Sequence, residues 1–558
     1  MTEYTPLKYN KRELALLVLP VASLIISCAI VSSKKPFWFD ELFSYYFLSD
    51  PSFSHMLTAF HDKINNTPIL YFFLGWFWDK IFGSSELSYR LFSSITFCAA
   101  LISVWTTLRR RYNFWPTTIG TLAVFCTSSV ILNQNAEARM YGLFLVVTAL
   151  AFRCYDNFHR KQNPTFKGLV INAGIHIAII HTHLFGPFYS GAILVALMLA
   201  DRYLKVWRPK IYLSIVLSWL TFLLYLPSFL IQADVGKPRT WLLTPGLQDL
   251  IDFYNLSVFV NSTTFAFLLL VSGLHLVYKQ RFANGPGLAT RESSNTDSNV
   301  PAVLFACVFF VVPVFVWIFS RTVKAIFWDR YMIPSALGVI ILLADVTSRL
   351  ISTRVVDDTF RKNKVGKAIR FLMIPAGLIG LAFYLLWQPI RFAKYYEGSA
   401  FVFEDPVKGG LPDVPIVVQN SSPFVMQNFY SPQRDKYFYI LDWEAAVNKH
   451  SGTSTPGVFK HFTALKKLYP ERFGKNILTT VEFLAKYDRF IVVTDGSDTL
   501  KCPENPIGLA LARRWFGALA CPQWVAMRLR NNPAYKLTYL TQTDYVTYLL
   551  VEKQSEKL

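Results

Sequence analysis

Residues 13–45 read ELALLVLPVASLIISCAIVSSKKPFWFDELFSY and decide the fold. The first part is an apolar run of about 20 residues, the length needed to cross about 30 Å of hydrocarbon. Directly after it, Asp40 and Glu41 form an adjacent carboxylate pair among aromatic residues. Because an ionised carboxylate facing lipid is costly, a pair at a membrane boundary is a candidate for chemistry at the bilayer surface. The alternative is an ordinary helix start, where Asp and Glu are favoured in the first turn.

Similar apolar runs recur along the N-terminal part of the chain. Of the 558 residues, 53% are hydrophobic and 16% charged, a composition typical of polytopic membrane proteins. The runs lie at 13–33, 91–108, 116–133, 141–152, 169–183, 184–200, 211–231, 263–277, 301–319, 331–346 and 371–388. We therefore expect a polytopic α-helical membrane protein with about 11 transmembrane helices over residues 1–390, and a soluble α/β domain over 391–558.

The formal net charge of +20 is distributed unevenly. Lys and Arg gather in alternate loops, such as 109–111, 153–167, 202–210 and 349–370, and the intervening loops are poorer in them. This is the positive-inside pattern, so we expect the N-terminus in the cytoplasm and the soluble domain outside a plasma membrane. The basic charge is then an orientation signal, and nucleic acid is not an expected partner. No small-residue cleavage site follows the first run, which we expect to remain as a signal anchor.

The segment 69–82 is apolar but short. It offers about 14 residues before Gly83, too few to span comfortably. We expect an interfacial or re-entrant helix, with Trp76 and Trp78 at the level of the headgroups. The first outer loop then runs from 34 to 90, and Asp40 shares it with Lys63.

Beyond residue 400 the sequence changes to that of a soluble α/β fold. We expect buried strands at 414–418, 437–441 and 489–493, helices near 456–469, 476–487 and 507–519, and two pairing strands at 535–539 and 545–549. This part of the sequence contains no phosphate-loop glycine motif, metal-ligand cluster or nucleophile elbow. We assign it to acceptor recognition or to a scaffold role. The spacing of Cys502 and Cys521 leaves a disulfide and a free pair both open.

Polar residues collect at the span ends that should face outward. They are Glu137, Arg139, Tyr141, His181, His183, Arg321, Lys324, Asp329, Arg330 and Tyr331. Each has an ordinary alternative, because Arg and Tyr at span ends are commonly interfacial anchors. His181 and His183 invite a metal site, but residues i and i+2 of a helix point to different faces.

An outward site with one carboxylate, several cations and many aromatic rings suits one reaction. A sugar on a lipid phosphate already has a good leaving group, so a base is needed for the acceptor hydroxyl and cations for the departing phosphate. Arg supplies bidentate donors for phosphate. Aromatic side chains can pack against sugar faces and isoprenoid chains.

Four motifs in order resemble the GT-C superfamily of membrane glycosyltransferases, of the protein-mannosyltransferase and lipid A aminoarabinose-transferase type. The resemblance covers about residues 12–390. Its motifs are Asp40-Glu41, Thr67-Pro68-Ile-Leu-Tyr71 through Phe82-Gly83 to Glu86-Leu-Ser-Tyr-Arg90, Ala138-Arg139-Met-Tyr141, and Asp329-Arg330-Tyr331-Met-Ile-Pro334.

The resemblance implies a polyprenyl-phosphate sugar donor and an inverting transfer, with Asp40 as the base and Glu41 orienting it. It implies a donor site lined by Arg139, Tyr141, Arg330 and Tyr331. Relatives often have a second proline where this chain has Asn65-Asn66-Thr67-Pro68. Lys63 would replace a phosphate-binding cation at a shifted position, so the phosphate clamp departs from the family pattern. The acceptor class (lipid, glycan or protein) is not transferable, and relatives differ in their use of a divalent metal.

Two other classes of protein compete with this interpretation. A transporter or flippase of lipid-linked sugars would place ionisable groups near the bilayer midplane. In the proposed spans, His176 is the only ionisable residue expected near the midplane. No inverted internal repeat is evident in the sequence. A non-catalytic surface protein would instead use the outer domain to bind a partner or a glycan.

Overall fold

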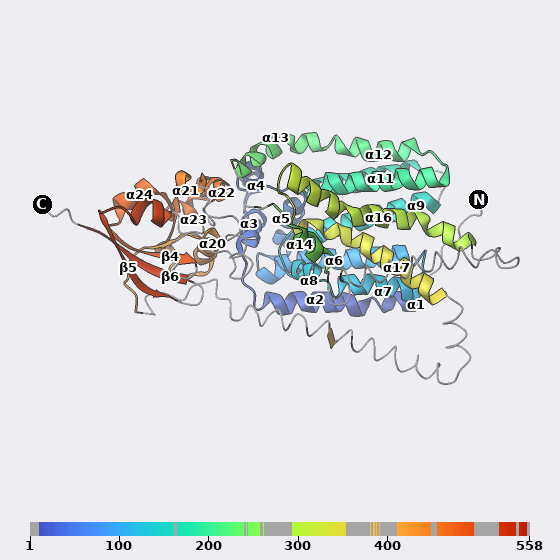
Figure 1. Ribbon diagram of the computed structural model, residues 1–558, viewed down its shortest axis with the longest axis horizontal. Coiled ribbons are helices and arrows are strands. Elements are labelled where there is room, and N and C mark those ends of the chain that lie inside the picture. Colours follow the sequence, from blue (N-terminus) through green and yellow to red (C-terminus); the bar gives the residue numbers. More distant parts are fainter. Residues whose placement is uncertain are drawn as a thin grey trace. The chain divides into compact units, whose positions relative to one another are not determined.

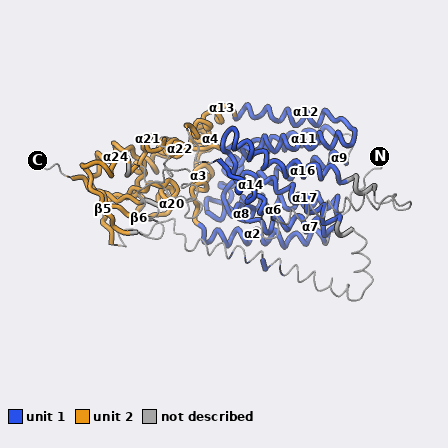
Figure 2. The backbone as a smooth tube through the Cα atoms, in the orientation of Figure 1, with its two compact units in different colours: residues 1–35, 67–225, 244–395 blue, residues 36–66, 226–243, 396–558 orange. Residues whose placement is uncertain are grey.

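The computed structural model describes residues 11–160, 164–238, 242, 244–256, 261, 293–352, 380, 383, 384, 387, 390, 410–447, 455–495, 524–542 and 546–554. The chain divides into two compact units (Figure 2). The first comprises 1–35, 67–225 and 244–395, and the second comprises 36–66, 226–243 and 396–558. The segment that carries Asp40 therefore belongs to the same unit as the C-terminal region.

The first unit is helical (Figure 1). Its helices are α1 (Lys11–Ala15), α2 (Val18–Ser32), α5 (Leu70–Phe82), α6 (Glu86–Leu108), α7 (Phe114–Phe125), α8 (Ser129–Asn135), α9 (Tyr141–Arg160), α10 (Phe166–Thr182), α11 (Gly186–Leu204), α12 (Pro209–Trp219), α14 (Leu247–Tyr254), α16 (Ser293–Thr322), the 3-10 helix η2 (Asp329–Ser335) and α17 (Ala336–Ser352). Helix α6 packs against α2 and α9, and α17 packs against α7 and α16. Helix α13 (Phe222–Ala233) runs in sequence from the first unit into the second.

Apolar runs within the described residues coincide with helices. By length and composition, the described part contains five helices able to cross a membrane, or up to six if the bent pair α7 and α8 is one span. They are Glu13–Ser32, Glu86–Leu108, Pro209–Gly236, Asn299–Thr322 and Asp329–Arg349. The expected total of about eleven stays a prediction, because the run at 263–277 and nearly all of 371–388 lie outside the described residues.

Helix α5 ends where its sequence requires. It has 13 residues, and it stops at Gly83, whose φ of 77° favours glycine. Helix α6 then starts at once, because the Ser85 side chain accepts a hydrogen bond from the Ser88 N–H at 3.1 Å. Residues 34–85 therefore contain three helices, of which α5 is shorter than the span length of about 20 residues.

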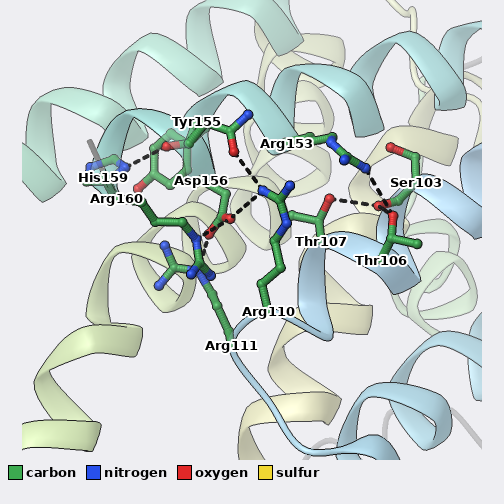
Figure 3. A network of polar contacts seen from close by, with 11 residues as sticks. Ser103, Thr106, Thr107, Arg110, Arg111, Arg153, Tyr155, Asp156, His159 and Arg160 are labelled. Atoms are coloured by element: carbon green, nitrogen blue, oxygen red, sulfur yellow. Dashed lines mark hydrogen bonds and ion pairs between the residues drawn. The ribbon is translucent and has the colours of Figure 1, made fainter. Parts of the chain in front are cut away.

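Ion pairs connect the end of α9 to the residues that follow α6 (Figure 3). Asp156, near the end of α9, is fully buried. It accepts a hydrogen bond from Arg160 Nε at 2.7 Å, pairs with Arg111, and lies 3.7 Å from Arg110. A buried carboxylate needs such partners to offset its lost hydration. The two basic clusters that follow α6 and end α9 thus lie at one end of the bundle, as a positive-inside pattern requires.

The second unit is built on a six-stranded mixed sheet in the order β3-β2-β1-β4-β6-β5. The strands are β1 (Ile416–Val418), β2 (Tyr437–Leu441), β3 (Ile477–Thr479), β4 (Arg489–Asp495), β5 (Tyr535–Gln542) and β6 (Val546–Lys553). The first four in spatial order are parallel, and β6 runs antiparallel to both β4 and β5. Val417 is paired with Phe438 on β2 and Val492 on β4, and all three side chains belong to the buried core.

Short helices complete the second unit. They are α3 (Phe39–Leu48), α4 (Phe53–Phe60), the 3-10 helices η1 (Asp234–Gly236) and η3 (Arg434–Lys436), α20 (Ser421–Tyr430), α21 (Trp443–Val447), α22 (Pro456–Leu468), α23 (Pro470–Phe473), α24 (Thr480–Lys486) and the π-helix η4 (Val525–Leu529). Helix α3 packs against α20, and α22 packs against η1. Helices from residues 36–66 and from the C-terminal region therefore share one core.

The predicted α/β character of the C-terminal region is confirmed. Strands β1, β2 and β4 fall at the expected positions, and β5 pairs with β6 as predicted. The helix expected over 476–487 is wrong in its first turn, because Ile477–Thr479 pairs with β2 as strand β3 and Thr479 caps the shorter α24. The helix expected at 507–519, with Cys502 and Cys521, lies outside the described residues.

Candidate functional site

The predicted site residues divide between the two units. Arg139, Tyr141, Arg330 and Tyr331 lie in the first unit, whereas Asp40, Glu41 and Lys63 lie in the second. Each group has its own geometry, described in turn below.

The four residues of the first unit come together around a fifth, His183. Tyr141 begins α9 and Tyr331 lies in η2, and their rings are nearly parallel with centroids 6.4 Å apart. The Arg330 guanidinium lies 5.9 Å from the centroid of each ring. The His183 ring lies 5.7 Å from Tyr141 and 5.2 Å from Tyr331, and the charges of Arg139 and Arg330 both act on it. We call these five residues the arginine–aromatic cluster.

Helix packing fixes the position of Arg139. Its N–H donates to Ser93 Oγ at 3.2 Å, and the Ser93 hydroxyl donates to the Arg139 carbonyl at 2.8 Å. Gly142 lets α9 approach α6 this closely, since a Cβ there would lie 2.6 Å from the Ser93 carbonyl oxygen and would also collide with Thr96. The backbone before Tyr141 is thereby attached to α6.

A buried ion pair fastens the segment just before Arg139. Lys35 Nζ donates to Glu137 Oε1 at 2.8 Å, and both side chains are nearly inaccessible. Arg90, fully buried, donates to the Lys35 carbonyl at 2.6 Å. Removing either partner of such a pair would leave an uncompensated buried charge. The connection from α8 to α9 is therefore held rigidly at both ends.

In the second unit, Glu41 acts as a helix cap. Its Oε2 accepts a hydrogen bond from the Trp38 N–H at 3.4 Å, and its side chain is fully buried. This is the helix-start alternative considered for the carboxylate pair. Asp40, the neighbouring residue, is only half-buried, and its backbone carbonyl accepts a hydrogen bond from Ser44 Oγ at 3.1 Å.

Lys63 lies in a cluster of charges. Its Nζ donates to Asp234 Oδ2 at 2.7 Å, and Lys460 Nζ donates to the same oxygen at 3.0 Å. Asp234 thus accepts hydrogen bonds from two ammonium groups, one from Lys63 and one from Lys460. In the structure the Lys63 ammonium therefore binds a carboxylate of its own chain.

His461 joins Lys63 and Asp40. Its Nδ1 donates to the Lys63 carbonyl at 2.6 Å, because a carbonyl can only accept. Burial lowers the pKa of His461 to about 4, and the negative charge of Asp40 acts in the opposite direction. The His461 ring also contacts Phe43 on α3, with centroids 5.7 Å apart. The C-terminal region thus places a neutral histidine beside the predicted base.

Further contacts build residues 36–66 into the second unit. The Phe37 N–H donates to Tyr430 Oη at 2.6 Å, and the Tyr469 hydroxyl donates to the Tyr46 carbonyl at 3.1 Å. His55 lies between the Asp50 carboxylate, at 2.5 Å, and the Leu468 carbonyl, at 3.1 Å. The helix that carries Asp40 is therefore packed on C-terminal elements.

Sequence reasoning did not single out four residues of these clusters as site residues: His183, Asp234, Lys460 and His461. The sequence places His183 among the polar residues at outward span ends, but it does not indicate that the ring packs between Tyr141 and Tyr331. Nothing local marks the other three, because their partners are far away in sequence. The described residues contain no group of three or more His, Cys, Asp or Glu that could hold a metal ion.

No protein-family model and no curated protein match the sequence. Among solved structures, the chain is similar to ArnT from Cupriavidus metallidurans bound to undecaprenyl phosphate, with 13% identity, a TM-score of 0.47, and coverage of 96% of this chain and 98% of that one. It is also similar to the oligosaccharyltransferase AglB from Archaeoglobus fulgidus in complex with an inhibitory peptide and a dolichol-phosphate (11%, TM-score 0.39, 85% and 69%). An apo form of the Archaeoglobus fulgidus oligosaccharyltransferase gives 12%, a TM-score of 0.41, and coverage of 93% and 73%. At such identities and TM-scores, the function has to be argued from the chain's own residues.

Proposed function

We propose that this chain is an integral-membrane glycosyltransferase of the GT-C superfamily. It transfers a sugar from a polyprenyl-phosphate-linked donor to a hydroxyl acceptor on the outer face of the membrane. The observation that carries the proposal is the arginine–aromatic cluster, in which two span-end arginines and two tyrosines from distant parts of the chain surround one histidine. Guanidinium groups bind phosphate in bidentate fashion, and flat rings offer surfaces to a sugar or an isoprenoid chain.

Arg139 and Arg330 bind the lipid phosphate in this proposal, with Tyr141 and Tyr331 lining the donor site. The acceptor hydroxyl oxygen attacks the anomeric carbon from the face opposite the phosphate, so that the configuration inverts. The bond from that carbon to the phosphate oxygen breaks, and the electron pair leaves with the lipid phosphate. The arginines favour this step because negative charge develops on the phosphate as the bond breaks.

Asp40 takes the proton of the acceptor hydroxyl as the general base. Asp40 is half-buried, and the buried Glu41 next to it stabilises the start of the helix and so orients Asp40. Lys63 serves the donor phosphate only by exchanging its Asp234 partner for the ligand. The acceptor is a hydroxyl of a lipid, a glycan or a protein.

The distribution of basic residues supports the orientation. The clusters at 109–111 and around Arg160 lie at one end of the first unit and are joined through Asp156. We assign that end to the cytoplasm, because basic residues are enriched there in membrane proteins. The N-terminus is then cytoplasmic and the C-terminal domain extracytoplasmic.

The direct test replaces Asp40 with Asn in the full chain. Membranes containing the variant receive a labelled polyprenyl-phosphate sugar, and transfer of label to acceptors is measured. We expect Asp40→Asn to lower turnover about 100-fold or more, the usual contribution of a general base. Asp62→Asn is the matched control, because Asp62 lies in the same segment but pairs with Lys467.

Two results would oppose the proposal. Unchanged turnover by a folded Asp40→Asn variant would remove Asp40 from the role of base. Flux of the lipid-linked sugar across proteoliposomes without any transfer product would favour a flippase instead.

A further inference from the structure

His183 is held by its own backbone turn. Its Nδ1 accepts a hydrogen bond from the Phe185 N–H at 3.1 Å, and its carbonyl accepts one from the Gly186 N–H at 2.7 Å. A Cβ at position 186 would collide with the backbone of Ile179 and lie 2.8 Å from Ile180 Cα, so the turn closes this tightly only with glycine. The backbone that carries the imidazole is therefore fixed, and its Nδ1 is already occupied by the hydrogen bond from Phe185.

These contacts define the protonation of the ring. A nitrogen that accepts a hydrogen bond carries no proton, so the neutral ring has its proton on Nε2. His183 is thus a neutral residue that presents Nε2–H as a donor.

Aromatic rings keep this donor in place. The His183 ring stacks on Phe144, with centroids 5.0 Å apart and planes at 22°. Tyr331, Phe185 and Tyr141 contact it at 5.2, 5.6 and 5.7 Å. With 3% of its surface exposed, the side chain has no room to change rotamer freely. Because the ring is already held in place, it loses little conformational entropy when it binds a ligand.

We propose that His183 is a phosphate-binding residue, whose Nε2–H donates a hydrogen bond to the phosphate held by Arg139 and Arg330. This rests on the proposed function and adds a residue to its donor site. A neutral donor supplies a directional hydrogen bond without placing a third positive charge beside two arginines. When the sugar leaves, the phosphate changes from a diester with one negative charge to a monoester with nearly two, so the bond strengthens along the reaction.

The test measures selectivity for phosphate. Full-length protein purified in detergent is titrated with polyprenyl phosphate and with the matching polyprenol, and the ratio of the two affinities is taken. His183→Phe keeps a ring in the aromatic packing and removes the donor, so we expect this ratio to fall about tenfold. His183→Gln keeps a side-chain N–H and should retain part of the ratio. His181→Phe is the control, because His181 ends the same helix and binds Thr221 Oγ1 instead.

The possible outcomes distinguish the proposed class of donor from the proposed role of His183. A wild-type protein that binds alcohol and phosphate equally would refute the proposed donor class itself. A wild-type protein that prefers phosphate, with His183→Phe retaining the full ratio, would overturn only the role of His183. Displacement of the lipid by millimolar inorganic phosphate would assign the site to free phosphate and overturn the lipid headgroup as its ligand. If His183→Phe does not fold, comparison of His183→Gln with His183→Met decides, because only the amide can donate, and equal ratios would refute the inference.

Discussion

Lys63 and Asp234 illustrate how single residues at the candidate site are held. Their ion pair includes Lys460, and the Lys63 and Asp234 side chains remain more than a third exposed. Exposed ion pairs stabilise a protein little, because water screens them and two side chains must be ordered. A lipid phosphate, whose negative charge rises from one toward two as the sugar leaves, can therefore compete for Lys63. The predicted donor-binding role of Lys63 is thus compatible with its present partner and stays a prediction.

His461 makes stability depend on pH. Its pKa is lowered to about 4 by burial, from about 6.5 in an unfolded chain. Between these values the unfolded chain binds a proton that the folded chain does not, so stability falls as the pH is lowered from 7 to 5. The loss from this residue should be on the order of 1 kcal/mol, because the side chain is partly exposed, and the hydrogen bond to the Lys63 carbonyl and the charge of Asp40 offset part of the effect of burial.

Thermal unfolding of the full chain at pH 7 and pH 5 measures this effect. We expect the melting temperature of His461→Gln to fall less between the two values than that of the wild type. Lys466→Gln is the control on the same helix, because Lys466 pairs with the exposed Glu482. Equal pH dependence in wild type and His461→Gln would contradict the assignment.

At the scale of elements, the contact between helices α6 and α9 positions Arg139 and Tyr141, two residues of the proposed donor site. Gly142 lies against the Ser93 carbonyl and Thr96 of α6, one residue after Tyr141. Gly142→Ala should push the helices apart and cost about 1–3 kcal/mol through overpacking. It should also weaken binding of polyprenyl phosphate, because Arg139 and Tyr141 move with α9. Lipid titration and thermal unfolding test both expectations.

Gly174 provides the matched control for this substitution. It lies within α10, and a Cβ there would meet nothing within 4 Å. Gly174→Ala should be neutral or slightly stabilising, because alanine is the better helix former. If the two alanine variants behave alike, the close helix contact does not position Arg139.

The sequence predicted the helices and strands better than it predicted which distant residues meet at the candidate site. Apolar runs marked the helices, and β-branched or aromatic runs marked β1, β2 and β4, because burial acts on every residue of a run. Strand β3 was missed, since three residues beside a helical pattern carry too little signal. Lys460 and His461 were missed for another reason: their partners Asp234 and Lys63 lie more than 200 residues away. Tertiary contacts of that kind leave no local pattern.

At the scale of the whole molecule, the second unit gives the C-terminal region a role. In the sequence, residues 36–66 are separated from the rest of the second unit by helices of the first unit. They nevertheless belong to the core of the second unit. Tyr430, Lys460 and His461 each bind this segment or its partner Asp234. The region thus acts as the support of the helix that carries Asp40.

A chain that ends at residue 395 tests this support. It lacks the hydrogen bond from His461 to the Lys63 carbonyl and the Lys460 contact to Asp234. We therefore expect loss of transfer activity, and faster cleavage by trypsin after Lys63 in membranes, followed by mass spectrometry of the fragment. Cleavage after Lys80, on α5 of the first unit, should keep its rate and serves as the internal control. Retained transfer together with unchanged protection of Lys63 would show that the helix bearing Asp40 stands without the C-terminal region, and the supporting role would then be wrong.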